Sequence, residues 1–231
     1  MDDFTTLTFN AVSRHFGRRR ALNDVSFSVE AGQVVALLGS NGSGKSTLLS
    51  IAATLLDPSS GEVRYGKATA AEGGPGLRAR IGLLGHDLYI YPELTAAENL
   101  RFFADLYGLE RVEDRVRDAL SWAALSDRAD DPAGSFSRGM RQRLALERAL
   151  LHEPRLLLLD EPFTGLDDVS STALRNRLAR ERERGAMLIV TTHELEAIDT
   201  LVDAAYVLTR GKAEMLVAGP GSLRDRYRRQ V

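Results

Sequence analysis

The stretch Gly39-Ser40-Asn41-Gly42-Ser43-Gly44-Lys45-Ser46-Thr47 decides the fold of this chain. It directly follows an apolar run at 34–38 and precedes a helical pattern over 48–56. Strand, glycine-rich turn and helix together make a phosphate-binding P-loop, in which backbone N–H groups and the helix N-terminus face the anion. We therefore predict that residues 39–47 bind a nucleoside triphosphate. Lys45 is expected at the β- and γ-phosphates, and the Ser46 hydroxyl at Mg²⁺.

The composition of the 231 residues excludes several classes of protein. The formal net charge is -2 and the sequence pI is about 6.1, so we expect no nucleic-acid partner. The absence of cysteine excludes disulfides and thiol chemistry. The acidic start, Met1 to Phe4, is unlike a signal peptide, and no apolar run approaches the ~18 residues of a membrane span. We expect a soluble chain that reaches a membrane only through a partner.

Apolar periodicity predicts an α/β core with a helical insertion. The pattern becomes helical from about 87 to 151, with helices over 95–107, 109–122 and 137–151, and we interpret this part as a helical subdomain. Trp122 is interpreted as a core aromatic of the second helix. Strands are expected at 5–12, 25–29, 34–38, 61–65, 81–85, 156–159, 188–190, 205–208 and 213–217, and the last two should form a hairpin. Further helices are expected at 168–184, 194–202 and 223–229. A turn is expected at 18–20 and a loose loop at 73–76.

Two carboxylates directly follow the buried run 156–159. A strand that ends in Asp160 delivers a carboxylate where a P-loop enzyme holds Mg²⁺, and we predict contact through water. Glu161, one residue further, is placed to accept a proton from an attacking water. His193 follows the strand at 188–192 and can hydrogen-bond both a γ-phosphate and that water. His15 and His152 are interpreted as surface histidines.

A second anion site is predicted at Ser137-Arg138-Gly139-Met140. A serine, a glycine and a helix N-terminus offer donors to a phosphate, although a plain serine N-cap would look the same. The P-loop already accounts for the binding of one nucleotide. The residues at 137–140 therefore do not by themselves identify which anion binds at the second site.

Taken together with Thr164-Gly165-Leu166-Asp167, the order and spacing of these motifs resemble those of ABC-transporter ATPases over nearly the whole chain. The resemblance implies a RecA-like α/β P-loop NTPase core with an antiparallel β-subdomain and an inserted helical subdomain. It implies one domain over 1–231, with the core at 1–86 and 152–231 and the helical subdomain at about 87–151. It also implies Mg²⁺-dependent ATP hydrolysis by a head-to-tail pair of subunits, for which we expect a homodimer.

The same resemblance implies roles for single residues. Glu161 is expected to be the catalytic base and His193 the switch, with Lys45 also catalytic. Phe16 is expected to stack on adenine. The residues expected to contact ATP held by the partner subunit are Ser137, Arg138, Gly139, Met140 and Asp167.

Two departures from the family pattern narrow the resemblance. The usual signature Leu-Ser-Gly-Gly-Gln is replaced by Phe136-Ser137-Arg138-Gly139-Met140, where Arg138 either faces solvent or adds a cation near the phosphates. The usual glutamine that contacts Mg²⁺ is replaced by His86, whose neutral imidazole can still accept from a metal-bound water. We therefore expect Ser46, Asp160 and His86 around Mg²⁺, the last two through water.

Gly85-His86, the segment 93–102, and Ser137 to Met140 with Gln142-Arg143 resemble the ATP-binding subunit of the cytochrome c biogenesis haem exporter. This resemblance implies an integral-membrane permease, haem-handling proteins as further possible partners, and a place on the cytoplasmic face of the cell membrane. The permease is expected to dock around 86–91. Alternatives are the ATPase of another ABC exporter, for a drug, lipid or small molecule, or a soluble ABC ATPase of repair or translation. A P-loop kinase or GTPase leaves Ser137 to Met140 unexplained, and the sequence lacks an Asn-Lys-x-Asp motif.

Overall fold

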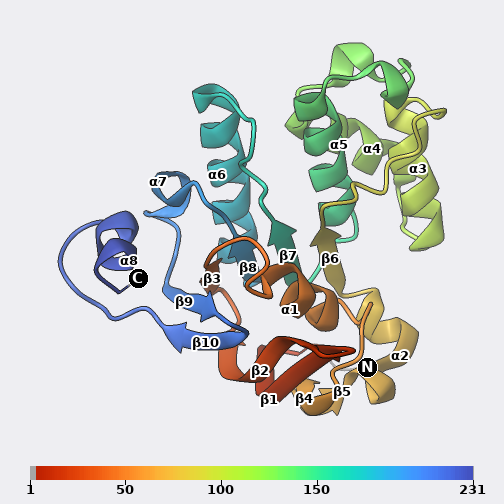
Figure 1. Cartoon of the computed structure of the whole chain (residues 1–231). Coiled ribbons are helices and arrows are strands. Elements are labelled where there is room, and N and C mark those ends of the chain that lie inside the picture. The colour runs from red at the N-terminus through yellow and green to blue at the C-terminus, as the bar shows by residue number, and fades with distance from the viewer. Residues whose placement is uncertain (1–3, 231) are drawn as a thin grey trace.

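The computed structural model describes residues 4–230, so the first three residues of the acidic start lie outside the description. Two sheets organise the chain (Figure 1). The smaller sheet is antiparallel, with strand order β2-β1-β4-β5. The larger sheet has the order β10-β9-β3-β8-β7-β6 and is parallel except for β10. The strands are β1 (Thr6–Phe16), β2 (Arg19–Glu30), β3 (Val34–Leu38), β4 (Ser60–Tyr65), β5 (Ala68–Thr69), β6 (Ile81–Leu84), β7 (Leu156–Asp160), β8 (Met187–Thr191), β9 (Ala204–Thr209) and β10 (Lys212–Met215).

Helices connect the strands and cover the larger sheet. The α-helices of the described residues are α1 (Lys45–Ala52), α2 (Ala70–Arg78), α3 (Ala96–Leu106), α4 (Val112–Trp122), α5 (Arg138–Leu150), α6 (Asp168–Glu183), α7 (Leu195–Ile198) and α8 (Leu223–Gln230), and two short 3₁₀ turns lie at Ser126–Arg128 and Ala133–Ser135. Within the described part of the chain, none of these helices has both the length and the apolar character needed to cross a bilayer.

The parallel strands are buried on both faces, as their continuous apolar sequences predict. Successive side chains of β7 alternate between two cores, because neighbouring residues of a strand point to opposite faces of the sheet. Leu156 and Leu158 belong to the core shared with α1 and the antiparallel sheet, whereas Leu157 and Leu159 belong to the core under α5 and α6. The helices α3, α4 and α5 form a third core and lie together to one side of the larger sheet (Figure 1).

Most element predictions are confirmed by the structure. The three helices predicted in the insertion are present, and the first begins with a capping box in which Thr95 and Glu98 each accept from the other's backbone N–H. The hairpin over Arg210-Gly211 and the basic helix at the end of the described residues are also present.

Two local predictions in the first third of the chain were wrong. The turn predicted at 18–20 is limited to Gly17 and Arg18, and β2 already begins at Arg19, which pairs with Phe16. The loop predicted at 73–76 lies inside α2, where a capping box between Thr69 and Glu72 starts a helix that kinks at Gly74. The capping box predicts the start of a helix, and here it was a better guide to the structure than the glycines, which favour a loop.

Trp122 is not a core residue. Its side chain is 44% exposed, and the guanidinium groups of Arg180 and Arg177 lie 4.4 and 5.1 Å from its ring centroid. His152 is likewise not a surface histidine, because its ring stacks on Tyr107 at 4.0 Å between centroids and its Nε2 lies 3.1 Å from the carbonyl of Ile81. Burial lowers the pKa of His152 to about 4.

Candidate nucleotide site

The P-loop connects β3 to α1 and depends on its glycines. Gly39 and Gly44 have φ values of 135° and 116°, which side-chain-bearing residues rarely adopt. A Cβ atom at Gly39 would lie 2.3 Å from the carbonyl of Leu208, and one at Gly44 would lie 2.5 Å from the carbonyl of Ala21. Packing against neighbouring backbone therefore requires glycine at both positions and fixes the curvature of the loop.

Lys45 is the first residue of α1, and its side chain folds back over the loop. Its Nζ donates to the carbonyls of Gly39 at 2.7 Å and Ser40 at 3.2 Å. Burial lowers the pKa of Lys45, while the nearby carboxylates of Glu161 and Asp160 act in the opposite direction. The amino group is thus held at the loop, between the backbone of the P-loop and two carboxylates.

A cavity of about 360 Å³ opens beside this loop. Three parts of the chain that are distant in sequence line it together: the antiparallel sheet through Phe16, the segment after β6 through His86, and the end of β7 through Asp160 and Glu161. Phe16 is half exposed, and the guanidinium of Arg14 lies 4.8 Å from its ring centroid. From the P-loop itself, the lining residues are Asn41, Gly42, Gly44, Lys45, Ser46 and Thr47.

The two acidic residues at the end of β7 are held by β8. The hydroxyl of Thr191, a fully buried residue, donates to Oδ1 of Asp160 at 2.5 Å and accepts from the backbone N–H of Glu161 at 3.0 Å. One hydroxyl therefore orients both residues. Glu161 itself has a positive φ of 52°, which turns its side chain away from the strand direction.

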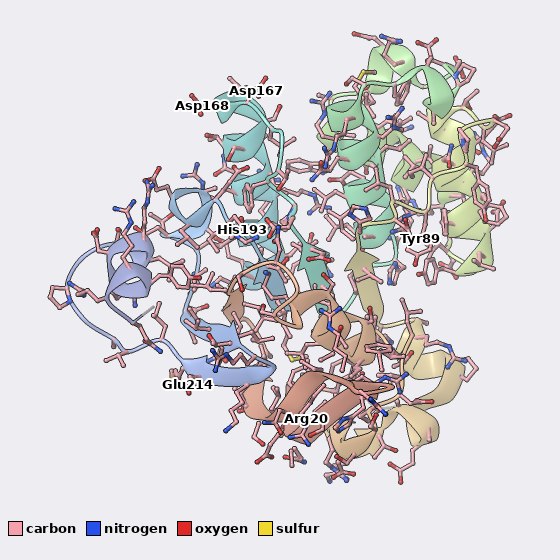
Figure 2. All side chains as sticks on the ribbon, in the orientation of Figure 1. Arg20, Tyr89, Asp167, Asp168, His193 and Glu214 are labelled. Atoms are coloured by element: carbon pink, nitrogen blue, oxygen red, sulfur yellow. The ribbon has the colours of Figure 1, made fainter. Side chains whose placement is uncertain are left out.

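His193 connects the carboxylate of Glu161 to the P-loop. Its backbone N–H donates to Oε2 of Glu161 at 3.1 Å, and its Nε2 lies 3.2 Å from Oε1 of Glu161 and 3.0 Å from Oδ1 of Asn41. The imidazole is half exposed and contacts two residues that line the cavity, Glu161 and Asn41. Figure 2 shows His193 beside the loop between β3 and α1.

The donor set of the cavity fits Mg²⁺ bound together with a nucleotide. Ser46, Asp160 and His86 line the same cavity and offer a hydroxyl, a carboxylate and an imidazole. Over residues 4–230, no three His, Cys, Asp or Glu side chains lie close enough to hold a metal ion by themselves. Mg²⁺ needs no such cage, since it commonly binds one or two protein oxygens, substrate phosphates and water.

The second predicted anion site lies apart from this cavity. Ser137 caps α5, its hydroxyl accepting from the N–H of Met140 at 3.3 Å, and Arg138 faces solvent in the single chain. A Cβ atom at Gly139 would meet nothing within 4 Å, so this face of the helix is open. Asp167 caps α6 by accepting from the N–H of Ser170 at 2.7 Å, which lowers its pKa, and Figure 2 shows it well apart from His193.

Three side chains near the site were not predicted from the sequence. Arg19 lines the cavity and donates to the carbonyl of Gly42 at 3.3 Å. Thr191 orients Asp160 and Glu161, and the side-chain amide of Gln142 donates to the carbonyl of Pro162 at 2.7 Å. A threonine at the end of the strand next to the acidic pair was the available signal for Thr191, whereas Gln142 is 20 residues from its partner and gave none.

The model of the family described as ABC transporter matches residues 22–164, which contain the P-loop, Ser137 to Met140 and the acidic pair. The chain belongs to this family. "ABC transporter ATP-binding protein NatA" of Bacillus subtilis (strain 168) is 35% identical over 213 residues, covering 89% of this chain and 87% of the relative. This ABC transporter subunit is an ATP hydrolase of the transport type.

Another relative and two solved structures extend the comparison. "Cytochrome c biogenesis ATP-binding export protein CcmA 2" of Cupriavidus metallidurans is 36% identical over 198 residues, covering 84% of this chain and 94% of the relative. A solved ATP-binding subunit of an ABC transporter superposes with a TM-score of 0.85 at 33% identity, covering 98% of this chain and 93% of that one. The ATP-binding cassette MJ0796, a dimer with ADP and Pi, gives a TM-score of 0.82 at 26% identity, covering 92% and 100%. Other relatives are named for Nod factor export, linearmycin resistance and aliphatic sulfonate import, so relatives at similar identity belong to transporters of different compounds.

Proposed function

We propose that this ABC transporter subunit binds Mg-ATP in the cavity beside the P-loop and hydrolyses it there. The observation that carries the proposal is that the P-loop and the acidic pair after β7 line one cavity, and that His193 contacts two of its lining residues, Glu161 and Asn41. Residues 39–47 hold the phosphates, with Lys45 at the β- and γ-phosphates, and Phe16 stacks on the base. Ser46, together with Asp160 and His86 through water, would hold Mg²⁺, which would supply positive charge for the phosphate oxygens.

Glu161 is proposed as the general base. Its carboxylate is 27% exposed and lies next to the P-loop, so a water between it and a γ-phosphate can pass its proton to Oε1 or Oε2. His193 fixes the carboxylate through its backbone N–H and has an imidazole that can hydrogen-bond the γ-phosphate. The contact between Nε2 of His193 and Oδ1 of Asn41 can break when a nucleotide binds, and a side chain that changes its partner on nucleotide binding can act as a switch.

The proposal extends to a second subunit. Ser137, Arg138, Gly139, Met140 and Asp167 lie apart from the cavity of their own chain, and ABC ATPases work as dimers. In a head-to-tail homodimer, the open N-terminus of α5 would face the γ-phosphate held by the partner's P-loop, where backbone N–H groups and the helix dipole favour an anion. Solvent-facing Arg138 would then add a cation near those phosphates.

The proposed domain division also rests on the fold. We assign one domain over 1–231, with the core at 1–86 and 152–231 and a helical subdomain at about 87–151. The separate hydrophobic core shared by α3, α4 and α5 supports this division. Exposed aromatic and aliphatic side chains between residues 89 and 106 include Tyr89, Tyr91, Phe102 and Leu106, and they support docking of an integral-membrane permease there. Figure 2 shows Tyr89 between the larger sheet and the helices. The subunit would then lie on the cytoplasmic face of the cell membrane.

For the transported compound we propose haem, in export linked to cytochrome c-type biogenesis. Support comes from His86, from Ser137 to Met140 followed by Gln142-Arg143, and from the similarity to the CcmA 2 relative. Haem-handling proteins would be further partners. The alternative is an ABC exporter of a drug, lipid or other small molecule, which the relatives named for Nod factor export and linearmycin resistance support.

The experiment is to purify the Glu161→Gln protein with Mg-ATP from its native membranes, because a subunit that binds but does not hydrolyse ATP should keep the closed dimer on its partner. A co-purifying permease together with haem absorbance supports haem export. A permease without haem contradicts the choice of haem and favours the alternative exporter. Recovery on ribosomes or DNA instead would contradict transport altogether.

A further inference from the structure

The backbone at Glu161 adopts a conformation that its side chain disfavours. Its φ of 52° lies in the left-handed region, which residues other than glycine, asparagine and aspartate seldom occupy. Such conformations persist where the surrounding structure holds them, and they gather at functional sites. The groups that hold the backbone of Glu161 therefore also fix where its carboxylate lies.

Two elements hold this backbone from opposite ends of the residue. On the N-terminal side, the N–H of Glu161 donates to the carbonyl of Thr191 at 3.1 Å and to its hydroxyl at 3.0 Å. On the C-terminal side, Nε2 of Gln142 donates to the carbonyl of Pro162 at 2.7 Å and lies 3.3 Å from that of Glu161. The carbonyl of Glu161 also accepts from the N–H of Thr164 at 3.3 Å, so the shorter bond to Pro162 is the main contribution of Gln142.

Gln142 is built into the protein interior. It is 9% exposed and lies in α5, five residues after Ser137, on the side of the helix that faces the turn after β7. A primary amide has two N–H donors, so one side chain can serve two adjacent carbonyls. Gln142 does not line the nucleotide cavity, and its side-chain hydrogen bonds go to the Glu161-Pro162 backbone.

We propose that Gln142 is a positioning residue that couples the N-terminus of α5 to the carboxylate of Glu161. The inference rests on the proposed role of Glu161 as the base. Ser137, at the N-terminus of α5, is proposed to contact the ATP that the partner subunit holds. Through Gln142, the position of Glu161 in one ATP site therefore depends on the position of α5, which contacts ATP in the other site. A shift of α5 moves the Glu161-Pro162 carbonyls, and with them the carboxylate.

The test uses Gln142→Met, which keeps the length and approximate volume of the side chain and removes both donors. The matched control is Gln33→Met, the same chemical change in the turn before β3, where Oε1 of Gln33 accepts from the N–H of Glu30 at 2.9 Å. Both proteins are assayed for kcat and KM of Mg-ATP hydrolysis and for ATP affinity. Gln142→Met is also combined with Glu161→Gln and measured by single-turnover hydrolysis.

We expect Gln142→Met to lower kcat on the order of 10- to 100-fold, as misplacement of a catalytic group does, with ATP affinity changed by less than about twofold. In the Glu161→Gln background, Gln142→Met should add less than about twofold, because the base that it positions is already gone. A kcat within about twofold of wild type, a parallel loss of ATP affinity, or a full additional loss in the Glu161→Gln background would each overturn the inference. If Glu161→Gln itself hydrolyses ATP normally, the proposed function fails as well. If Glu161→Gln is inactive and Gln142→Met is normal, only the present inference fails.

Discussion

His193 and Glu161 make a two-point contact across the ends of neighbouring strands. The backbone N–H of His193 donates to Oε2 of Glu161 at 3.1 Å, while its Nε2 lies 3.2 Å from Oε1. One contact comes from the main chain and persists whichever way the imidazole turns. The other ends when the imidazole rotates toward a ligand, so entry of a nucleotide can free one carboxylate oxygen while the other stays fixed.

The first prediction concerns Glu161→Gln. The amide keeps the shape of the carboxylate but cannot accept the proton of an attacking water, so ATP hydrolysis should fall on the order of 10²-fold or more while ATP binding is retained. The measurement is steady-state phosphate release together with equilibrium binding of ATP. Glu194→Gln, which removes the neighbouring carboxylate, is the control and should keep wild-type turnover. Near-normal turnover of Glu161→Gln would exclude Glu161 as the base.

The second prediction concerns Lys45→Ala. Removal of the ammonium group takes away a cation that we expect to contact the phosphates, so ATP affinity should fall by about tenfold or more. Isothermal titration calorimetry with ATP measures this affinity. Lys212→Ala on the exposed face of β10 is the control for loss of a positive charge. Equal ATP affinity in both variants would contradict the assignment of the P-loop.

Local patterns predicted the parts of the site that are contiguous in sequence. The P-loop was predictable because its strand, its glycines and the first residues of α1 occupy fewer than 20 consecutive positions, and each contributes a separate local signal. Asp160 and Glu161 were predictable because the buried run 156–159 fixes the strand that carries them. The contacts of Thr191, Gln142 and Arg19 were not, because they join segments 20 or more residues apart and depend on packing between elements.

The errors have a physical explanation. Val116, Ala119 and Leu120 form the buried face of α4, and Trp122, two residues beyond Leu120, points away from Leu120 at the edge of that face. Helical periodicity therefore explains the exposure of Trp122. The prediction of a core residue was wrong because it relied on the aromatic character of the side chain and not on its position in the helix. His152 is partly buried through contacts with Tyr107 and Ile81, which are distant in sequence and gave no local signal.

The third prediction concerns the hydroxyl of Thr191. Thr191→Val keeps the shape of the side chain but removes the donor to Asp160 and one acceptor of the Glu161 N–H, so the free energy of unfolding should fall by about 1–3 kcal/mol. ATP hydrolysis should fall by about tenfold, because both acidic residues lose a fixed orientation. Urea unfolding and phosphate release measure the two effects. Thr191→Ser, which restores the hydroxyl, should recover most of the turnover; failure of this variant to do so would show that packing, and not the hydroxyl, matters.

The last prediction concerns the pH dependence of stability and rests on His152. Burial lowers the pKa of His152 to about 4, from an ordinary value of 6.5, and the hydrogen bond to the Ile81 carbonyl only partly offsets this effect. Between these two values the unfolded chain binds a proton that the folded protein does not, so stability falls as the pH falls from 6.5 toward 4. A shift of this size corresponds to a loss of about 3 kcal/mol across the window.

His152→Gln removes this proton-linked term, while its amide can still donate to Ile81. Urea unfolding at several pH values between 4 and 7.5 should therefore show a flatter curve for His152→Gln than for the wild-type protein, with the difference confined to the region below pH 6.5. His15→Gln, a substitution at an exposed position in β1, serves as the control. Curves of equal slope for wild type and His152→Gln would show that His152 takes up its proton without unfolding. In that case the stacked ring would have to open locally at acid pH.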